Sequence, residues 1–183
     1  PSGSTCRPRR CSTDVDELDA RFGTAIRAVY SNRTSLEDYV LDADLVIGAV
    51  LVKGARAPRL VSAEMVTAMR AGSVLVDVAI DQGGSMETSR ATTHTDPTYV
   101  VDGVVHYAVA NMPGAVPRTS TYALNNVTLP HALRIAGKGW QQALADDEHL
   151  LQGLNIAAGK VTCEPVAKAL GYDAIPATQA LQI

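Results

Sequence analysis

The sequence has no excess of positive charge, few cysteines and no long apolar run. Its 183 residues carry a net charge of −3, which offers nothing to neutralise a phosphate backbone, so we expect no nucleic-acid partner. Three cysteines without zinc-type spacing imply neither a disulfide framework nor a structural metal. Because no apolar run reaches the ~18 residues of a membrane span, we expect a cytoplasmic protein with no membrane partner.

Several catalytic and nucleotide-binding motifs are also missing. The sequence contains no G-x-S-x-G nucleophile elbow, no Walker A loop and no G-x-G-x-x-G. Its histidines, which we expect at surface or turn positions, show no metal-ligand spacing; they are His94, His106, His131 and His149. No chemistry can be assigned from a single local motif.

What is present is an alternation of apolar runs and capped helical segments. Residues 44–51 and 73–80 are almost continuously apolar, which is typical of strands buried on both faces of a parallel sheet. A further strand is expected at 25–31, and helices at 14–22, from Thr34 or Ser35 to Leu41, and at 62–69, where Ser62 can cap. This alternation predicts an α/β fold with a doubly wound parallel sheet.

The second half of the chain adds a hairpin and helices. Asp102-Gly103 joins two β-rich runs, 98–101 and 104–111, and is a strong two-residue turn signal that places a hairpin at or near the sheet edge. A long helix is expected from Thr119 to about Gly137, with a kink or a break at Pro130.

Ligands of open α/β sheets bind outside the carboxyl ends of the strands, so the strand exits are the candidate sites. The three exits are 51–55, 81–84 and 110–114. Glycine in the first could mark a tight turn or the close approach of a flat ligand. Asp81, in the second, is either a turn cap or a functional carboxylate, and Asn111 and Met112 in the third belong to a strand exit or to a site.

Three segments in order carry a family resemblance: DADLVIGAVLVKGARAP (42–58), AGSVLVDVAIDQGGSMETSR (71–90) and VVHYAVANMPGAVPRTSTYAL (104–124). Together they resemble the C-terminal half of bacterial alanine dehydrogenase, a relative of the nicotinamide-nucleotide transhydrogenase α subunit. The resemblance implies NAD as cofactor, oxidative deamination of L-alanine to pyruvate and ammonium in L-alanine catabolism, and a homohexamer. It also implies a partial Rossmann-type NAD-binding domain over 13–118 and a helical segment over 119–183 that returns to a substrate domain.

The resemblance also implies roles for individual residues. Asp81 matches the family's catalytic aspartate. The cofactor contacts implied are Ser31 beside the adenosine, Val50 and Leu51 against the adenine, Val78, Ala79, Ile80 and Asp81 beneath the nicotinamide and its ribose, Arg90, and Val109, Ala110, Asn111 and Met112 on the last nicotinamide side.

The chain departs from the family pattern at its start. Residues 1–12 do not resemble the family, have the composition of a disordered segment, and put Arg9 where the family has an acid for the ribose. The first strand, the glycine loop and the domain with the substrate-binding lysine and catalytic histidine are absent, so we expect an enzyme fragment that is inactive alone, with a misannotated start. Some members bind a metal at positions that are Arg134 and Lys138 here, so we expect no metal.

Two alternatives stay open at this point. One is a half-Rossmann remnant that serves as a non-catalytic interaction module. The other is a transhydrogenase α subunit, which would partner a membrane component.

Overall fold

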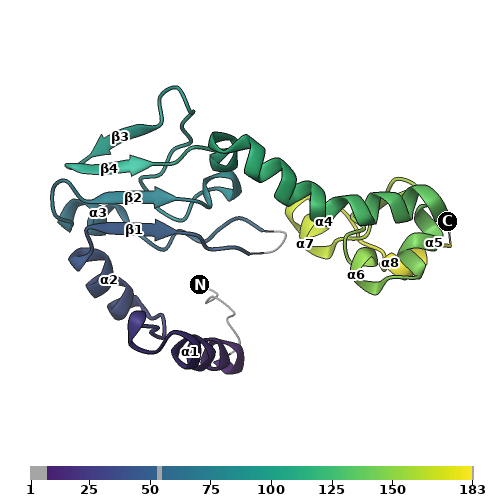
Figure 1. The fold of residues 1–183 in the computed structure, drawn as a ribbon, viewed down its shortest axis with the longest axis horizontal. Helices are drawn as coiled ribbons and strands as arrows, with labels where there is room; N and C mark the ends of the chain where they lie inside the picture. The colour runs from purple at the N-terminus through teal and green to yellow at the C-terminus, as the bar shows by residue number, and fades with distance from the viewer. Residues whose placement is uncertain (1–7, 53–54, 183) are drawn as a thin grey trace.

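The computed structural model describes residues 8–52 and 55–182, and it consists of a sheet unit and a helical unit joined by one long helix (Figure 1). The sheet unit contains, in chain order, α1 (Pro8–Phe22), η1 (Gly23–Ala25), α2 (Arg33–Asp42), β1 (Leu45–Gly48), α3 (Ala63–Ala68), β2 (Val74–Asp77), η2 (Ile80–Gln82), β3 (Thr98–Val101), β4 (Val104–Tyr107) and η3 (Met112–Ala115). The joining helix is α4 (Pro117–Lys138). The helical unit contains α5 (Trp140–Ala145), α6 (Glu148–Leu151), β5 (Ile156–Ala157), β6 (Lys160–Val161), α7 (Glu164–Leu170) and α8 (Ala177–Ala180).

The main sheet has the strand order β1-β2-β4-β3. Strands β1, β2 and β4 are parallel, and β3 runs antiparallel to β4 at the edge. Asp102 (φ 50°) and Gly103 (φ 81°) both have positive φ in the β3–β4 turn, as a type I′ hairpin requires. The predicted α/β, Rossmann-like fold and its edge hairpin are confirmed.

The core lies between the sheet and the helices α2 and α3. Its most buried members are Val66, Leu75, Met86 and Val104, each at most 1% exposed, and Met65 and Met69 belong to the same cluster. Each fully buried side chain of this size contributes roughly 1.5–3 kcal/mol relative to an exposed one. The predicted strand 73–80 supplies Leu75 to this core, whereas β1 contributes only the partly buried Val46. Leu45 and Ile47 are 55% and 60% exposed, so the prediction that 44–51 is buried on both faces is wrong: only one face of β1 packs against the core.

Helix caps set where α2 and α3 begin. Asn32 accepts a hydrogen bond from the Ser35 backbone N–H, and the Ser35 hydroxyl accepts one from the Asn32 N–H, so α2 starts at Arg33, slightly before the predicted Thr34 or Ser35. Ser62 caps α3 as predicted. Glu87 adds a second cap, because its carboxylate accepts the Ala63 N–H at 2.9 Å.

The N-terminal predictions are only partly right. The helix predicted over 14–22 begins at Pro8, so residues 8–12 are helical rather than disordered, while residues 1–7 lie outside the described part. Proline fits a first helical turn because it lacks the N–H that would have no partner there. The strand predicted at 25–31 is wrong: the segment is extended around Ile26 but joins no strand of the described sheet, and a strand needs a hydrogen-bonded neighbour.

Helix α4 projects away from the sheet and continues through Pro130 (Figure 1). Of the predicted kink or break, the break is therefore wrong, although Pro130 removes one hydrogen bond from the helix. None of its 22 residues is buried, and Tyr122, Leu124, Val127 and Leu133 are each more than 60% exposed. Within 8–52 and 55–182, no helix has both the length and the apolarity needed to cross a membrane.

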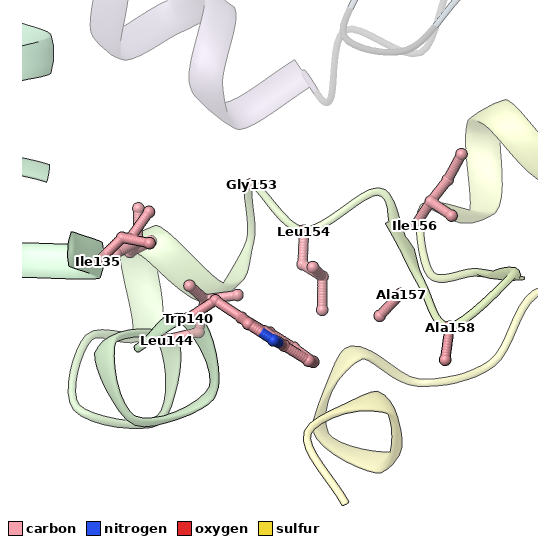
Figure 2. Close-up of a pocket in the computed structure, with 9 residues that line it drawn as sticks. Ile135, Trp140, Leu144, Gly153, Leu154, Ile156, Ala157 and Ala158 are labelled. Atoms are coloured by element: carbon pink, nitrogen blue, oxygen red, sulfur yellow. The ribbon is translucent and has the colours of Figure 1, made fainter. Parts of the chain in front are cut away.

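The helical unit has its own small core of Ala143, Leu144, Ala157, Ala167 and Ala180. A cavity of about 500 Å³ opens beside this core, with Trp140 and Leu144 on one side and Ala157 and Ala158 on the other (Figure 2). Its lining is apolar and includes none of the predicted site residues. It therefore belongs to the packing of this unit and not to the strand exits.

Two ion pairs connect α4 to the segment before α6: Arg134 with Asp147, and Lys138 with Asp146. Arg134 and Lys138 are thus neutralised by neighbouring carboxylates. The hydrogen bond from the backbone N–H of Leu150 is the main cause that lowers the pKa of Asp147, and Arg134 lowers it further. The hydrogen bond from Lys138, followed by one from Gln142, lowers the pKa of Asp146.

These lowered pKa values predict acid sensitivity of the helical unit. Because folding favours the ionised carboxylates, their contribution is present above the ordinary carboxyl pKa of about 4 and is lost as pH falls through the lowered values. We expect the thermal midpoint of the Trp140 fluorescence transition to fall more steeply below about pH 4 in the unsubstituted chain than in Asp147→Asn. Identical pH dependence in both proteins would show that Asp147 does not contribute.

Candidate functional site

The carboxyl ends of β1, β2 and β4 meet at one edge of the sheet. Gly48 and Asp77 are register partners, and Val76 pairs with Tyr107, so the chain leaves all three strands at the same level. The Val78 N–H donates to the Gly48 carbonyl at 2.8 Å, which keeps the first two exits side by side. The structure thus brings together the three exits that the sequence predicts.

The β1 exit presents apolar side chains to solvent. Leu51 is 69% exposed, and Val50 is half-buried next to it. An exposed leucine at a strand exit gives a flat ring system an apolar surface to cover. The predicted close approach at Lys53 and Gly54 lies outside the described residues.

At the second exit, the strand is shorter than predicted and the turn that follows it is longer. The strand ends at Asp77, and Ile80–Gln82 forms the 3-10 turn η2, followed by left-handed Gly83 and Gly84. Val78 is 46% exposed and Ile80 is half-buried, whereas Ala79 is buried, so only its backbone could face a ligand. Asp81 lies in η2 with an exposed side chain.

The turn-capping role that Asp81 could have had belongs to Asp77. This aspartate is fully buried. Its Oδ1 accepts hydrogen bonds from the Ala79 N–H (3.1 Å) and the Ser85 hydroxyl (3.0 Å), and its Oδ2 accepts the Ser85 N–H (2.9 Å). In the described part of the chain, the Asp81 carboxylate accepts no hydrogen bond. The carboxylate that faces solvent is Asp81, and the one that holds the turn is Asp77.

Arg90 lies on the loop that follows the β2 exit. The Arg90 guanidinium stacks above the ring of Tyr99, 4.0 Å from the ring centroid. The backbone N–H of Arg90 donates to the Tyr99 hydroxyl at 2.8 Å. That hydroxyl in turn donates to the Thr88 carbonyl. Burial is the main cause that raises the pKa of Tyr99, so the phenol stays neutral and holds the Arg90 backbone in place.

The β4 exit is anchored by the loop 91–97. Thr92 forms a bridge with Val109, and the His94 Nε2–H donates to the Asn111 carbonyl at 2.7 Å. Val109 is buried, whereas Ala110 and Asn111 are exposed and Met112 is half-buried. The Asn111 amide and the Met112 thioether are thus available at the same sheet edge as Asp81.

His106 is not the surface or turn histidine that the sequence suggested. It is 1% exposed in β4 and stacks on Tyr99, with ring centroids 4.9 Å apart. Its Nδ1–H donates to the Val104 carbonyl at 3.0 Å, and its Nε2 accepts the Thr88 hydroxyl at 2.7 Å. With both ring nitrogens satisfied, His106 is a structural residue.

The structure does not join Ser31 to the other predicted site residues. Ser31 is exposed at the end of the extended segment before α2, which is not part of the sheet. Its predicted place beside an adenosine rests on the resemblance alone.

The donor set at the sheet edge suits a nicotinamide dinucleotide. Such a ligand needs an apolar surface for its rings and a few polar groups for its amide, ribose and phosphates. Leu51 and Val78 supply exposed apolar surface, Asn111 an amide, and Arg90 a cation. The residues present therefore fit this cofactor.

Comparison with known families agrees with this geometry. The family described as alanine dehydrogenase/PNT, C-terminal domain, matches residues 10–164. The chain belongs to this family.

Individual alanine dehydrogenases are similar over most of the chain. The alanine dehydrogenase of Bacillus subtilis is 60% identical over 167 residues, which are 91% of this chain and 44% of that protein. The alanine dehydrogenase of Halomonas elongata is 57% identical over 163 residues, or 89% of this chain and 44% of that protein. The chain thus spans less than half the length of these relatives.

Solved structures show the same relationship. An L-alanine dehydrogenase structure superposes with a TM-score of 0.76 at 50% identity, covering 87% of this chain and 44% of the other. A transhydrogenase from Sinorhizobium meliloti superposes less well, with a TM-score of 0.51 at 30% identity over 68% of this chain and 34% of the other. The chain is more similar to the alanine dehydrogenase than to this transhydrogenase.

Sequence reasoning missed the residues that hold the β1 and β2 exits together. Asp77 interrupts an otherwise apolar strand, and Gly48 stands at the same register in the neighbouring strand. A charged residue at the end of a buried strand, opposite a glycine, is a signal that could have identified them.

Proposed function

We propose that this chain forms the cofactor side of an NAD-dependent alanine dehydrogenase, which converts L-alanine to pyruvate and ammonium. The single observation that supports the proposal most is the convergence of Leu51, Asp81 and Asn111 at one sheet edge, in a chain that belongs to the alanine dehydrogenase/PNT family. The nicotinamide of bound NAD⁺ would accept hydride from the substrate carbon.

Each group at the edge has a role in this proposal. Val50 and Leu51 would form the apolar wall for the adenine; away from the edge, Ser31 would lie beside the adenosine, on the resemblance alone. Val78, the Ala79 backbone and Ile80 would lie beneath the nicotinamide ribose, and Arg90 would contact the cofactor through its guanidinium. Val109 to Met112 would border the nicotinamide, with the Asn111 amide as a polar partner.

Asp81 would manage charge and protons at the reacting nitrogen. Its carboxylate is exposed at the tip of the β2 exit, where it can accept a proton from the substrate ammonium. The same negative charge stabilises the cationic nitrogen that develops as the amine is oxidised.

We further propose a cytoplasmic homohexamer that acts in L-alanine catabolism, as in the family resemblance. The exposed apolar side chains of α4 support this proposal, because another subunit would bury them. Size-exclusion chromatography with light scattering tests the assembly.

Binding of NAD⁺ to the 183-residue chain provides the first test. Saturation-transfer NMR detects weak ligands, and we expect transfer to both the adenine and the nicotinamide protons. Leu51→Ala should weaken binding about fivefold, because it removes apolar surface that the adenine would cover. Leu170→Ala in α7 replaces an equally exposed leucine, 63% against 69%, and should leave binding unchanged. Absence of transfer in the unsubstituted chain would favour the non-catalytic remnant instead.

A further inference from the structure

The Asp77 carboxylate lies beneath the proposed site but takes no direct part in it. It is fully buried at the last position of β2, and its three described hydrogen bonds all go to the turn that carries Asp81. A buried carboxylate is costly unless it is fully hydrogen-bonded, so these bonds fix the turn and the charge together. Asp77 therefore acts on the conformation of that turn.

The hydrogen bonds of Asp77 close the turn at both ends. Ala79 lies two residues after Asp77, and Ser85 lies eight residues after it. The backbone N–H groups of both residues donate to the Asp77 carboxylate. Between them, the Ala79 carbonyl accepts the N–H groups of Gln82 (2.9 Å) and Gly84 (3.0 Å). Asp81 is thus held at the tip by the backbone on either side, while its own carboxylate faces solvent.

Ser85 also ties this turn to the β1 exit. Its carbonyl accepts the N–H groups of Leu60 (2.7 Å) and Val61 (3.3 Å), which lie on the segment that returns from β1. Gly48 makes room for it, because a Cβ there would be 2.1 Å from the Ser85 hydroxyl oxygen. One serine therefore connects Asp77 with both exits.

We propose that Asp77 and Ser85 form a clamp that positions the Asp81 turn, and with it the nicotinamide side of the cofactor site. This inference rests on the proposed function. Asp77 and Ser85 are positioning residues: they act through the place of Val78 to Asp81 and touch neither cofactor nor substrate. A catalytic group must be held within about 0.5 Å of its productive place, and a turn that is hydrogen-bonded at both ends restricts the movement of the residues between them.

Two matched serine substitutions in the full 183-residue chain test the clamp. Ser85→Ala removes the hydroxyl that donates to Asp77. Ser73→Ala, at the opposite end of β2, removes a similarly buried hydroxyl, which donates to the Ala43 carbonyl at 3.3 Å. With NAD⁺ as the probe, we expect Ser85→Ala to lower saturation transfer to the nicotinamide protons at least threefold relative to the adenine protons. In Ser73→Ala the ratio should stay as in the unsubstituted chain.

The ratio of saturation transfer to the nicotinamide protons over that to the adenine protons distinguishes a positioning role from a general loss of structure. A purely structural loss would weaken both ends alike, and that result, or equal ratios in the two variants, would overturn the proposal. If the unsubstituted chain binds no NAD⁺ at all, the proposed function fails, and amide exchange then decides on the clamp. Ser85→Ala should speed exchange of the Ala79 and Gly84 amides at least tenfold over Ser73→Ala, and unchanged exchange would refute the clamp.

Discussion

Replacing Gly48 by alanine should lower the free energy of unfolding of the sheet unit by about 3 kcal/mol, from overpacking together with a lost hydrogen bond to a buried charge. The added Cβ would lie 2.1 Å from the Ser85 hydroxyl oxygen and 3.0 Å from the Met86 methyl carbon. Ser85 would have to leave Asp77, whose buried Oδ1 would lose one of its two partners. Urea unfolding followed through the NMR signals of β2 and β4 measures the change.

Gly137 provides the matched control for this substitution. It lies in α4, and an added Cβ there would meet no atom within 4 Å. Gly137→Ala should therefore leave the sheet unit unchanged and stabilise the helix by up to about 1 kcal/mol. A Gly48→Ala protein with unchanged sheet stability would mean that the backbone relaxes around the methyl group without disturbing Ser85.

Asp81→Asn should reduce kcat by roughly 10²–10⁴, the usual range for the loss of a positioned acid or base. The assay uses a chimera in which this chain is joined to the remaining part of the Bacillus subtilis alanine dehydrogenase, its 60% identical relative. The amide keeps the size and the hydrogen-bonding capacity of the side chain but loses its charge, so NAD⁺ affinity should stay within a few-fold. Alanine-dependent formation of NADH gives the rate.

Glu87→Gln is the control for this charge removal. Glu87 follows the same exit, and its carboxylate caps α3, so its loss should affect stability and not kcat. Near-normal kcat in a folded Asp81→Asn chimera would remove Asp81 from the chemistry. An equal loss in both variants would point instead to the shared loop.

The parts of the fold that could be predicted were those with a local chemical cause. Apolar runs predicted the strands β1 and β2, and Ser62 predicted the start of α3. The Asp102-Gly103 pair predicted the hairpin turn, in which both residues have positive φ. The strand at 25–31 failed because the local pattern indicates β propensity but cannot show whether a neighbour exists to pair with it.

The site shows the same division. The three exits were predictable because parallel strands end at one edge. The charge at the end of β2 could mark Asp77, but it could not show that Asp77 caps the turn in place of Asp81. Which of two nearby carboxylates turns inward depends on a left-handed backbone at Gly83 and Gly84, and on the space beside Gly48. His106 was misplaced for a related reason, since its partners Thr88 and Tyr99 come from other segments.

The exposed course of α4 has a consequence for how the protein unfolds. The sheet unit and the helical unit have separate cores, and the helix between them buries none of its own residues, so little ties the melting of one to that of the other. Unfolding of this chain need not be a single cooperative transition. Its one tryptophan, Trp140, is in the helical unit, so its fluorescence can report that unit as folded after the sheet unit has already opened.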